Sequence, residues 1–102
     1  MRLSDIDPGS PVGSIVAVEV DGEPMAAVRT AGGWVLTADR CPHAQCPFSL
    51  DGELADDGTL ICNCHGSEFD PVSGALLLGP ALTGITVVPL KVERNTLNFA
   101  PR

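Results

Sequence analysis

Tyrosine is absent from this 102-residue sequence, and the other aromatic residues are few: one tryptophan and three phenylalanines. Basic residues are also scarce. Six Lys and Arg stand against 13 Asp and Glu, which leaves a formal net charge of −7. A chain this acidic is poorly suited to binding nucleic acid or an anionic membrane surface. A basic patch on another protein is the more natural counterpart.

Long apolar runs are missing as well. No stretch approaches the roughly 20 apolar residues that a transmembrane helix needs, so we expect no direct membrane insertion by this chain. Residues 1–10 contain one Arg and two Asp without an apolar core, which is unlike a secretory signal peptide. As written, the sequence predicts a cytoplasmic protein. It would be extracytoplasmic if the chain were a fragment of an anchored protein.

The length predicts one compact domain over residues 1–102. The 11 glycines and nine prolines, with few helix-favouring runs, favour an all-β chain rich in turns. Tight turns are expected at Asp21-Gly22, Gly32-Gly33 and Arg94-Asn95. Hydrophobic patterns predict strands over residues 16–20, 25–30, 34–37, 59–61, 75–78, 86–93 and 96–99. Pro89 interrupts one of these strands, so we place it at a sheet edge or a bulge.

Soft metal ligands are concentrated in two short segments of the chain. All four cysteines and both histidines lie in Cys41-Pro42-His43-Ala44-Gln45-Cys46 and Cys62-Asn63-Cys64-His65-Gly66-Ser67. The first segment contains a C-x-H spacing and the second a C-x-x-H spacing. Together they offer two thiolates and two imidazoles, one of each from each segment. A 2Fe–2S centre with mixed ligation uses this set, with two Cys on one iron and two His on the other.

Other sites can also be built from cysteine and histidine. A structural zinc ion in tetrahedral geometry would make the chain a zinc-stabilised interaction module. Zinc fingers typically use C-x-x-C and H-x-x-x-H spacings, and the two remaining cysteines would have no role in such a site. A metal-free chain with two disulfides would leave both histidines unexplained.

The two segments, C-P-H-A-Q-C and C-N-C-H-G-S, resemble those of the Rieske iron–sulfur family, and the likeness extends to Phe69-Asp70, Gly74 and Gly79-Pro80-Ala81. It covers about residues 34–82. The resemblance implies an all-β, Rieske-type antiparallel β-sandwich with a small cluster-binding subdomain of two loops, about residues 38–82. It also implies one Rieske-type 2Fe–2S cluster per chain. The implied ligands are Cys41 and Cys62 on one iron, and His43 and His65 on the other.

The same resemblance assigns a role to the two remaining cysteines. Rieske subunits of cytochrome bc complexes join the corresponding residues in a disulfide between the two loops, so we expect a Cys46–Cys64 disulfide. It would clamp the loops over the cluster and limit access of solvent. The alternative is a pair of free, buried thiols in a reducing cytosol.

Residues around the ligands are expected to tune the cluster. Two imidazoles in place of two thiolates raise the potential to roughly −150 to +300 mV, against about −400 mV for all-Cys plant-type clusters. Gly66 lets the backbone approach the cluster or adopt a positive φ. By resemblance, the Ser67 hydroxyl donates a hydrogen bond to a bridging sulfide. Phe69 stands where high-potential members have a Tyr, so one potential-raising hydrogen bond is missing. Gly79 and Pro80 belong to the loop that covers the cluster.

The function implied by the resemblance is one-electron transfer by a soluble Rieske-type ferredoxin, without substrate turnover of its own. It would pass electrons from a reductase to an oxygenase or oxidase. The alternative is a Rieske subunit or soluble domain of a quinol-oxidising cytochrome bc-type complex, with a cytochrome as partner. Three departures from the quinol-oxidising subunits argue against this alternative: Ala44, Gln45 and Leu82.

Other residues near the two segments have two interpretations each. Trp34 and Phe48 could guide electrons or partners, but core packing suits them better. The acidic residues between Asp51 and Asp57 form either a docking patch or a solvated loop. Asp39 and Arg40, just before the first segment, are either partner contacts or ordinary surface charges.

Overall fold

The computed structural model describes residues 1–42 and 45–99. Its strands are β1 (Ile15–Val20), β2 (Glu23–Thr30), β3 (Gly33–Ala38), β4 (Gly52–Leu54), β5 (Leu60–Cys62), β6 (Ser67–Phe69), β7 (Leu76–Leu78), β8 (Val87–Glu93) and β9 (Thr96–Phe99). A 3₁₀ turn, η1 (Leu3–Asp5), lies near the N-terminus, and a short helix, α1 (Phe48–Asp51), precedes β4.

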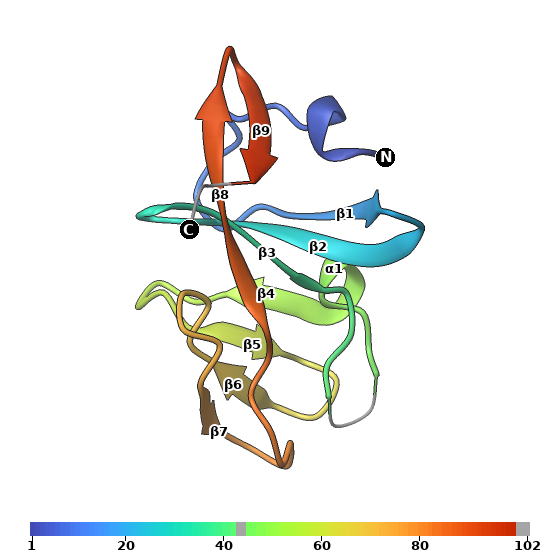
Figure 1. Cartoon of the computed structure of the whole chain (residues 1–102). Helices are drawn as coiled ribbons and strands as arrows, with labels where there is room; N and C mark the ends of the chain where they lie inside the picture. Colours follow the sequence, from blue (N-terminus) through green and yellow to red (C-terminus); the bar gives the residue numbers. More distant parts are fainter. Residues whose placement is uncertain (43–44, 100–102) are drawn as a thin grey trace.

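The strands form two antiparallel sheets, which confirms the expected all-β fold (Figure 1). A five-stranded base sheet has the order β1-β2-β3-β8-β9, and a four-stranded sheet has the order β4-β5-β6-β7. The cluster-binding part is therefore more than two loops on a sandwich, because it contains a sheet of its own. The sequence did not predict β4, β6, η1 or α1.

Backbone conformation explains the hairpins of the base sheet. Asp21 and Gly22 have φ of 52° and 81°, and Arg94 and Asn95 have φ of 52° and 62°. Two consecutive left-handed residues match the twist of the flanking strands, as in two-residue hairpin turns of type I′. Both predicted turns are confirmed. The turn between β2 and β3 lies one residue earlier than predicted, because Thr30 pairs with Gly33.

Strand β2 is buried on both faces and so joins two hydrophobic cores. Consecutive side chains of a strand point to opposite faces. Accordingly, Ala27 packs with Val18, Leu36, Leu90 and Leu97 in the core of the base sheet. Ala26 packs on the other side with Cys41, Cys62, Phe48, Phe69, Leu60 and Ala81. The second core, which we call the loop core, holds the two segments against the base sheet.

Pro89 lies at the point where β8 changes partner. Residues 87–89 of β8 pair with β3, and residues 90–93 pair with β9. Pro89 pairs with β3 on one side and with no strand on the other, so a proline without an N–H breaks no hydrogen bond on the unpaired side. Although β8 is internal in the sheet order, Pro89 therefore lies where one side of β8 is unpaired, as at the edge of a sheet.

Candidate metal centre

Each ligand-rich segment occupies a loop beside the loop core. The first loop connects β3 to α1, and the second connects β5 to β6. Cys41 lies in the first loop and Cys62 ends β5. Both cysteines are outside any disulfide, and each is only 1% exposed. The structure thus places two free thiols on two different loops within one core.

The two thiols interact with each other. Burial raises the pKa of the Cys62 thiol, and the neighbouring Cys41 thiol raises it further, while the backbone N–H groups of Cys64 and His65 act in the opposite direction. Metal ions bind the thiolate form of cysteine. Binding of a metal here would therefore release the thiol proton that burial helps to retain on Cys62. The N–H groups of Cys64 and His65 favour a negative sulfur at Cys62, because a hydrogen bond to a thiolate stabilises its charged form.

The backbones of the two loops follow the same pattern. The N–H of Gln45 donates to the carbonyl of Cys41 at 2.7 Å, and the N–H of Gly66 donates to the carbonyl of Cys62 at 2.8 Å. Each bond closes a turn four residues after the cysteine. Both donors are left-handed, with φ of 57° for Gln45 and 83° for Gly66. Glycine adopts this conformation without strain, whereas a side chain at Gln45 costs about 1–2 kcal/mol.

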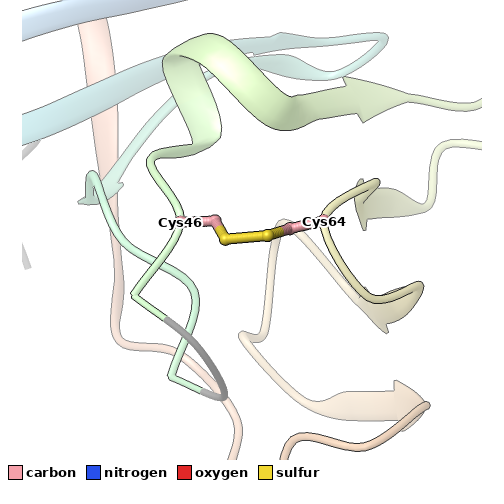
Figure 2. Close-up of a disulfide and its surroundings, with 2 residues drawn as sticks. All are labelled: Cys46 and Cys64. Carbon is pink, nitrogen blue, oxygen red and sulfur yellow. A yellow bond between two sulfur atoms is a disulfide. The ribbon is translucent and has the colours of Figure 1, made fainter.

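A disulfide joins the two loops (Figure 2). Cys46 from the first loop and Cys64 from the second are bonded, with their Cα atoms 6.4 Å apart. This is the pair expected from the family resemblance. The covalent link ties Cys41 and Cys62 to each other through the loops that carry them, since Cys41 also donates its N–H to the carbonyl of Cys46 at 2.8 Å.

One imidazole donor, His65, lies close to the disulfide. His65 is exposed, and its ring nitrogen and the two disulfide sulfurs lie within 4.8 Å of one another. The other expected imidazole ligand, His43, and its neighbour Ala44 lie outside the described residues. The described part of the site therefore supplies two buried thiols and one exposed imidazole, a mixed donor set that fits a cluster with Cys on the inside and His on the outside.

Ser67 and the segment after β7 cover the second loop. The fully buried Ser67 hydroxyl accepts a hydrogen bond from the N–H of Ala81 at 3.2 Å. A hydroxyl that accepts one bond still has its proton to donate, as the expected bond to a sulfide requires. Gly79 (φ +115°) packs so closely that an added Cβ would lie 2.5 Å from the Cα of Ser67. Gly79 and its neighbour Pro80 thus begin a tightly seated covering segment.

Phe69 and Phe48 pack together beneath the cysteines. Both rings are fully buried, with centroids 5.9 Å apart in an edge-to-face arrangement. Trp34 is also buried and donates its indole N–H to the carbonyl of Pro8 at 3.1 Å. Core packing accounts for all three aromatic side chains, as expected for Trp34 and Phe48. Phe69 brings no hydroxyl to the site.

Two polar contacts that the sequence did not reveal anchor the loops. Both carboxylate oxygens of Asp39 accept bonds from Ser49, one from its N–H at 2.8 Å and one from its hydroxyl at 2.5 Å. The N-cap residue of α1, Pro47, makes no side-chain cap, so Asp39 caps this helix from the end of β3. The side chain of Asn63 donates to Glu53 at 2.9 Å, and its N–H to the carbonyl of Asp51 at 2.8 Å.

These contacts decide part of what the sequence left open. Asp39 is a structural residue that closes the first loop. Glu53 holds the second loop, and Asp57 accepts from the N–H of Thr59 in its own turn. The only local signal for Asp39 was its position two residues before Cys41, since its partner lies ten residues away.

None of the helices in the described part of the chain has the length and apolarity that a membrane span requires.

Comparison with known proteins gives a consistent family. Residues 1–89 match the family model of the Rieske [2Fe-2S] domain. The ferredoxin subunit of 3-phenylpropionate/cinnamic acid dioxygenase from Escherichia coli K12 is 35% identical over 78 residues, which is 76% of this chain and 73% of that protein.

Solved structures agree with this match. The ferredoxin of carbazole 1,9a-dioxygenase from Nocardioides aromaticivorans IC177 superposes with a TM-score of 0.81, at 22% identity, over all of this chain and 97% of that one. A chain from the complex of reduced oxygenase and oxidised ferredoxin in carbazole 1,9a-dioxygenase has a TM-score of 0.75 and 27% identity, and 97% of this chain and 96% of that one are covered.

Proposed function

The chain belongs to the Rieske [2Fe-2S] domain family, and we propose that it is a soluble one-electron carrier that passes electrons from a reductase to an oxygenase or oxidase. The observation that carries this proposal is the placement of two buried thiols and one exposed imidazole on two disulfide-linked loops. The curated relatives support it, because the E. coli protein is named as the ferredoxin subunit of a dioxygenase. The proposed compartment is the cytoplasm.

The 2Fe–2S cluster, when bound, supplies one-electron redox chemistry at a potential set by its ligands and hydrogen bonds. We assign Cys41 and Cys62 to one iron, and His43 and His65 to the other. The two thiols lie in the loop core and are shielded from water, whereas His65 reaches the surface. The imidazole edge is therefore the proposed point of electron entry and exit.

The remaining residues of the site hold and tune this arrangement. The Cys46–Cys64 disulfide limits movement of the loops relative to each other. Ser67 is held by Ala81 with its proton available for a sulfide. Because Phe69 has no hydroxyl, only one of the two potential-raising bonds is present. We therefore propose a potential between those of dioxygenase-type ferredoxins and quinol-oxidising subunits.

Reconstitution tests the proposed role. The purified holoprotein is combined with the reductase and the terminal oxygenase of an aromatic-ring dioxygenase, and NADH-driven product formation is measured. We expect turnover to depend on the concentration of this protein, with apoprotein as the inactive control. Full oxygenase turnover without the protein, or failure of the reductase to reduce it, would contradict the role.

The disulfide favours a second candidate, a Rieske subunit of a quinol-oxidising complex. The family members with such a disulfide include these subunits, and the Cys46–Cys64 bond is present here. Anaerobic mixing with a short-chain ubiquinol distinguishes the two functions. Rapid reduction by the quinol would support the second candidate, and slow reduction would support the carrier.

A further inference from the structure

Leu82 is the most exposed of the large hydrophobic side chains in the described part of the chain. Its exposed fraction is 94%, against 81% for Leu50 and 70% for Val72. A single exposed leucine is common in proteins and has no significance by itself. Leu82 differs from an ordinary exposed leucine because the residues before it, Gly79 and Ala81, pack against Gly66 and Ser67, next to the proposed point of electron exit.

The segment that carries Leu82 is seated on the second loop. Ala81, the preceding residue, is 3% exposed and donates its N–H to Ser67. Gly79 lies against the backbone of Gly66 and Ser67, with no room for a Cβ. Leu82 is therefore presented on an anchored backbone, and binding through it would require little ordering of the chain.

Exposed residues without a charged side chain in the second loop and the covering segment include Cys64, Gly66 and Pro80. Arg40 lines a surface hollow together with Gly84 and Ile85, which closely follow Leu82. Two acidic residues flank the second loop: Glu53 binds the side chain of Asn63, and Glu68 directly follows Ser67 in β6. Residues 40–86 contain six Asp and Glu but one basic residue, Arg40.

Protein interfaces commonly have an apolar centre and a polar or charged rim, and a few residues near the centre contribute most of the binding energy. We propose that Leu82 is the anchor of the docking surface, and that it inserts into an apolar depression rimmed by Lys and Arg on the electron-accepting partner. This inference rests on the proposed carrier function and names the partner chemistry that the surface fits.

Electron transfer to cytochrome c tests the proposal, since this probe has an exposed apolar haem edge surrounded by lysines. Reduced holoprotein is mixed with the cytochrome in a stopped-flow instrument at low ionic strength. For Leu82→Ala we expect a fivefold to tenfold lower second-order rate constant, typical of the loss of one interface anchor. An unchanged rate constant for Leu82→Ala would overturn the proposal.

Val92→Ala is the matched control. Val92 is 55% exposed and lies in the β8–β9 hairpin, at the far end of the molecule from β7 (Figure 1). We expect this variant to react like the wild type. The reduction potential and the reduced-state EPR spectrum of Leu82→Ala should also match the wild type, because Leu82 is outside the ligand set. A shifted potential would show that the residue acts on the cluster and would overturn its role as a docking anchor.

The charged rim is tested by salt. The wild-type rate constant should fall as ionic strength rises, and Glu68→Gln should weaken this dependence. A rate independent of salt would overturn the basic rim proposed for the partner. If wild type reduces the cytochrome through Leu82 but does not support oxygenase turnover in the reconstituted system, the carrier function fails while the docking surface stands. If Leu82→Ala leaves oxygenase turnover unchanged, the docking surface fails while the carrier function stands.

Discussion

Ser67 links the covering segment to the proposed cluster through a single hydroxyl. Its oxygen accepts from the N–H of Ala81, and its side chain is fully buried. Because the oxygen accepts this bond, its proton remains available to donate toward the expected sulfide. Such donors stabilise the extra negative charge of the reduced state.

Ser67→Ala should therefore lower the reduction potential. Loss of one hydrogen bond to a charged group, about 1.4 kcal/mol, corresponds to roughly 60 mV for one electron. Protein-film voltammetry measures the shift. Ser73→Ala is a matched control, because Ser73 also accepts a backbone N–H at 3.2 Å, from Ala75, in an exposed turn. Equal potentials for Ser67→Ala and wild type would refute the hydrogen bond to the sulfide.

Gln45 is a strained residue at a position whose counterpart in the second loop is glycine. We predict that Gln45→Gly stabilises the protein by up to about 1 kcal/mol, since glycine adopts φ near 57° without the cost of a side chain. Gln45→Ala keeps the strain and should give no gain. The midpoint temperature of bleaching of the visible cluster absorbance reports both. A lower midpoint for Gln45→Gly would show that the glutamine side chain contributes more than its backbone costs.

At the scale of elements, the two loops depend on contacts from outside them. Asp39 follows β3 and caps α1 through Ser49, which fixes both ends of the first loop. Asp39→Ala should destabilise the protein by about 1–2 kcal/mol, the usual effect of losing a helix cap. Asp39→Asn, which can still accept the N–H of Ser49, is expected to lose less. Thermal bleaching of the holoproteins ranks the three chains, and equal midpoints would show that the cap is dispensable.

The disulfide is the second element-scale constraint. The double variant Cys46→Ser/Cys64→Ser removes a link between residues 18 apart, and a loop of this size contributes about 3 kcal/mol by restricting the unfolded chain. For a domain of this length the bleaching midpoint should fall by roughly 10–20 °C. Treatment of wild type with a dithiol should reproduce the decrease. A midpoint within about 2 °C of wild type would contradict a clamping role.

Local patterns in the sequence predicted the hairpins of the base sheet and the loop positions of the cysteines. The turns at Asp21-Gly22 and Arg94-Asn95 were predicted correctly because each pair contains Gly or Asn, residue types that favour the positive φ that the turn requires. Strands β4 and β6 were not predicted, because they form through pairing with β5 on both of its sides and carry no pattern of their own. The Asp39–Ser49 contact was equally beyond prediction, since it depends on how the first loop folds back.

At the scale of the molecule, β2 couples the base sheet to the cluster-binding part. Ala26 and Ala27 face the two cores from adjacent positions, and their small side chains let both cores approach the strand closely. The acidic residues of the cluster-binding part then face solvent on a rigid support. A base sheet that supports a separate cluster-binding part suits an electron carrier, whose redox site must approach a partner without rearranging.

These two loops are expected to hold a cluster with mixed Cys and His ligation. Pulsed EPR of the reduced holoprotein tests this ligation most directly, because nitrogen nuclei bound to the reduced iron modulate the signal. We expect couplings from two imidazole nitrogens, with one lost in His65→Cys. A colourless protein that binds zinc, or a paramagnetic cluster without nitrogen couplings, would contradict the claim.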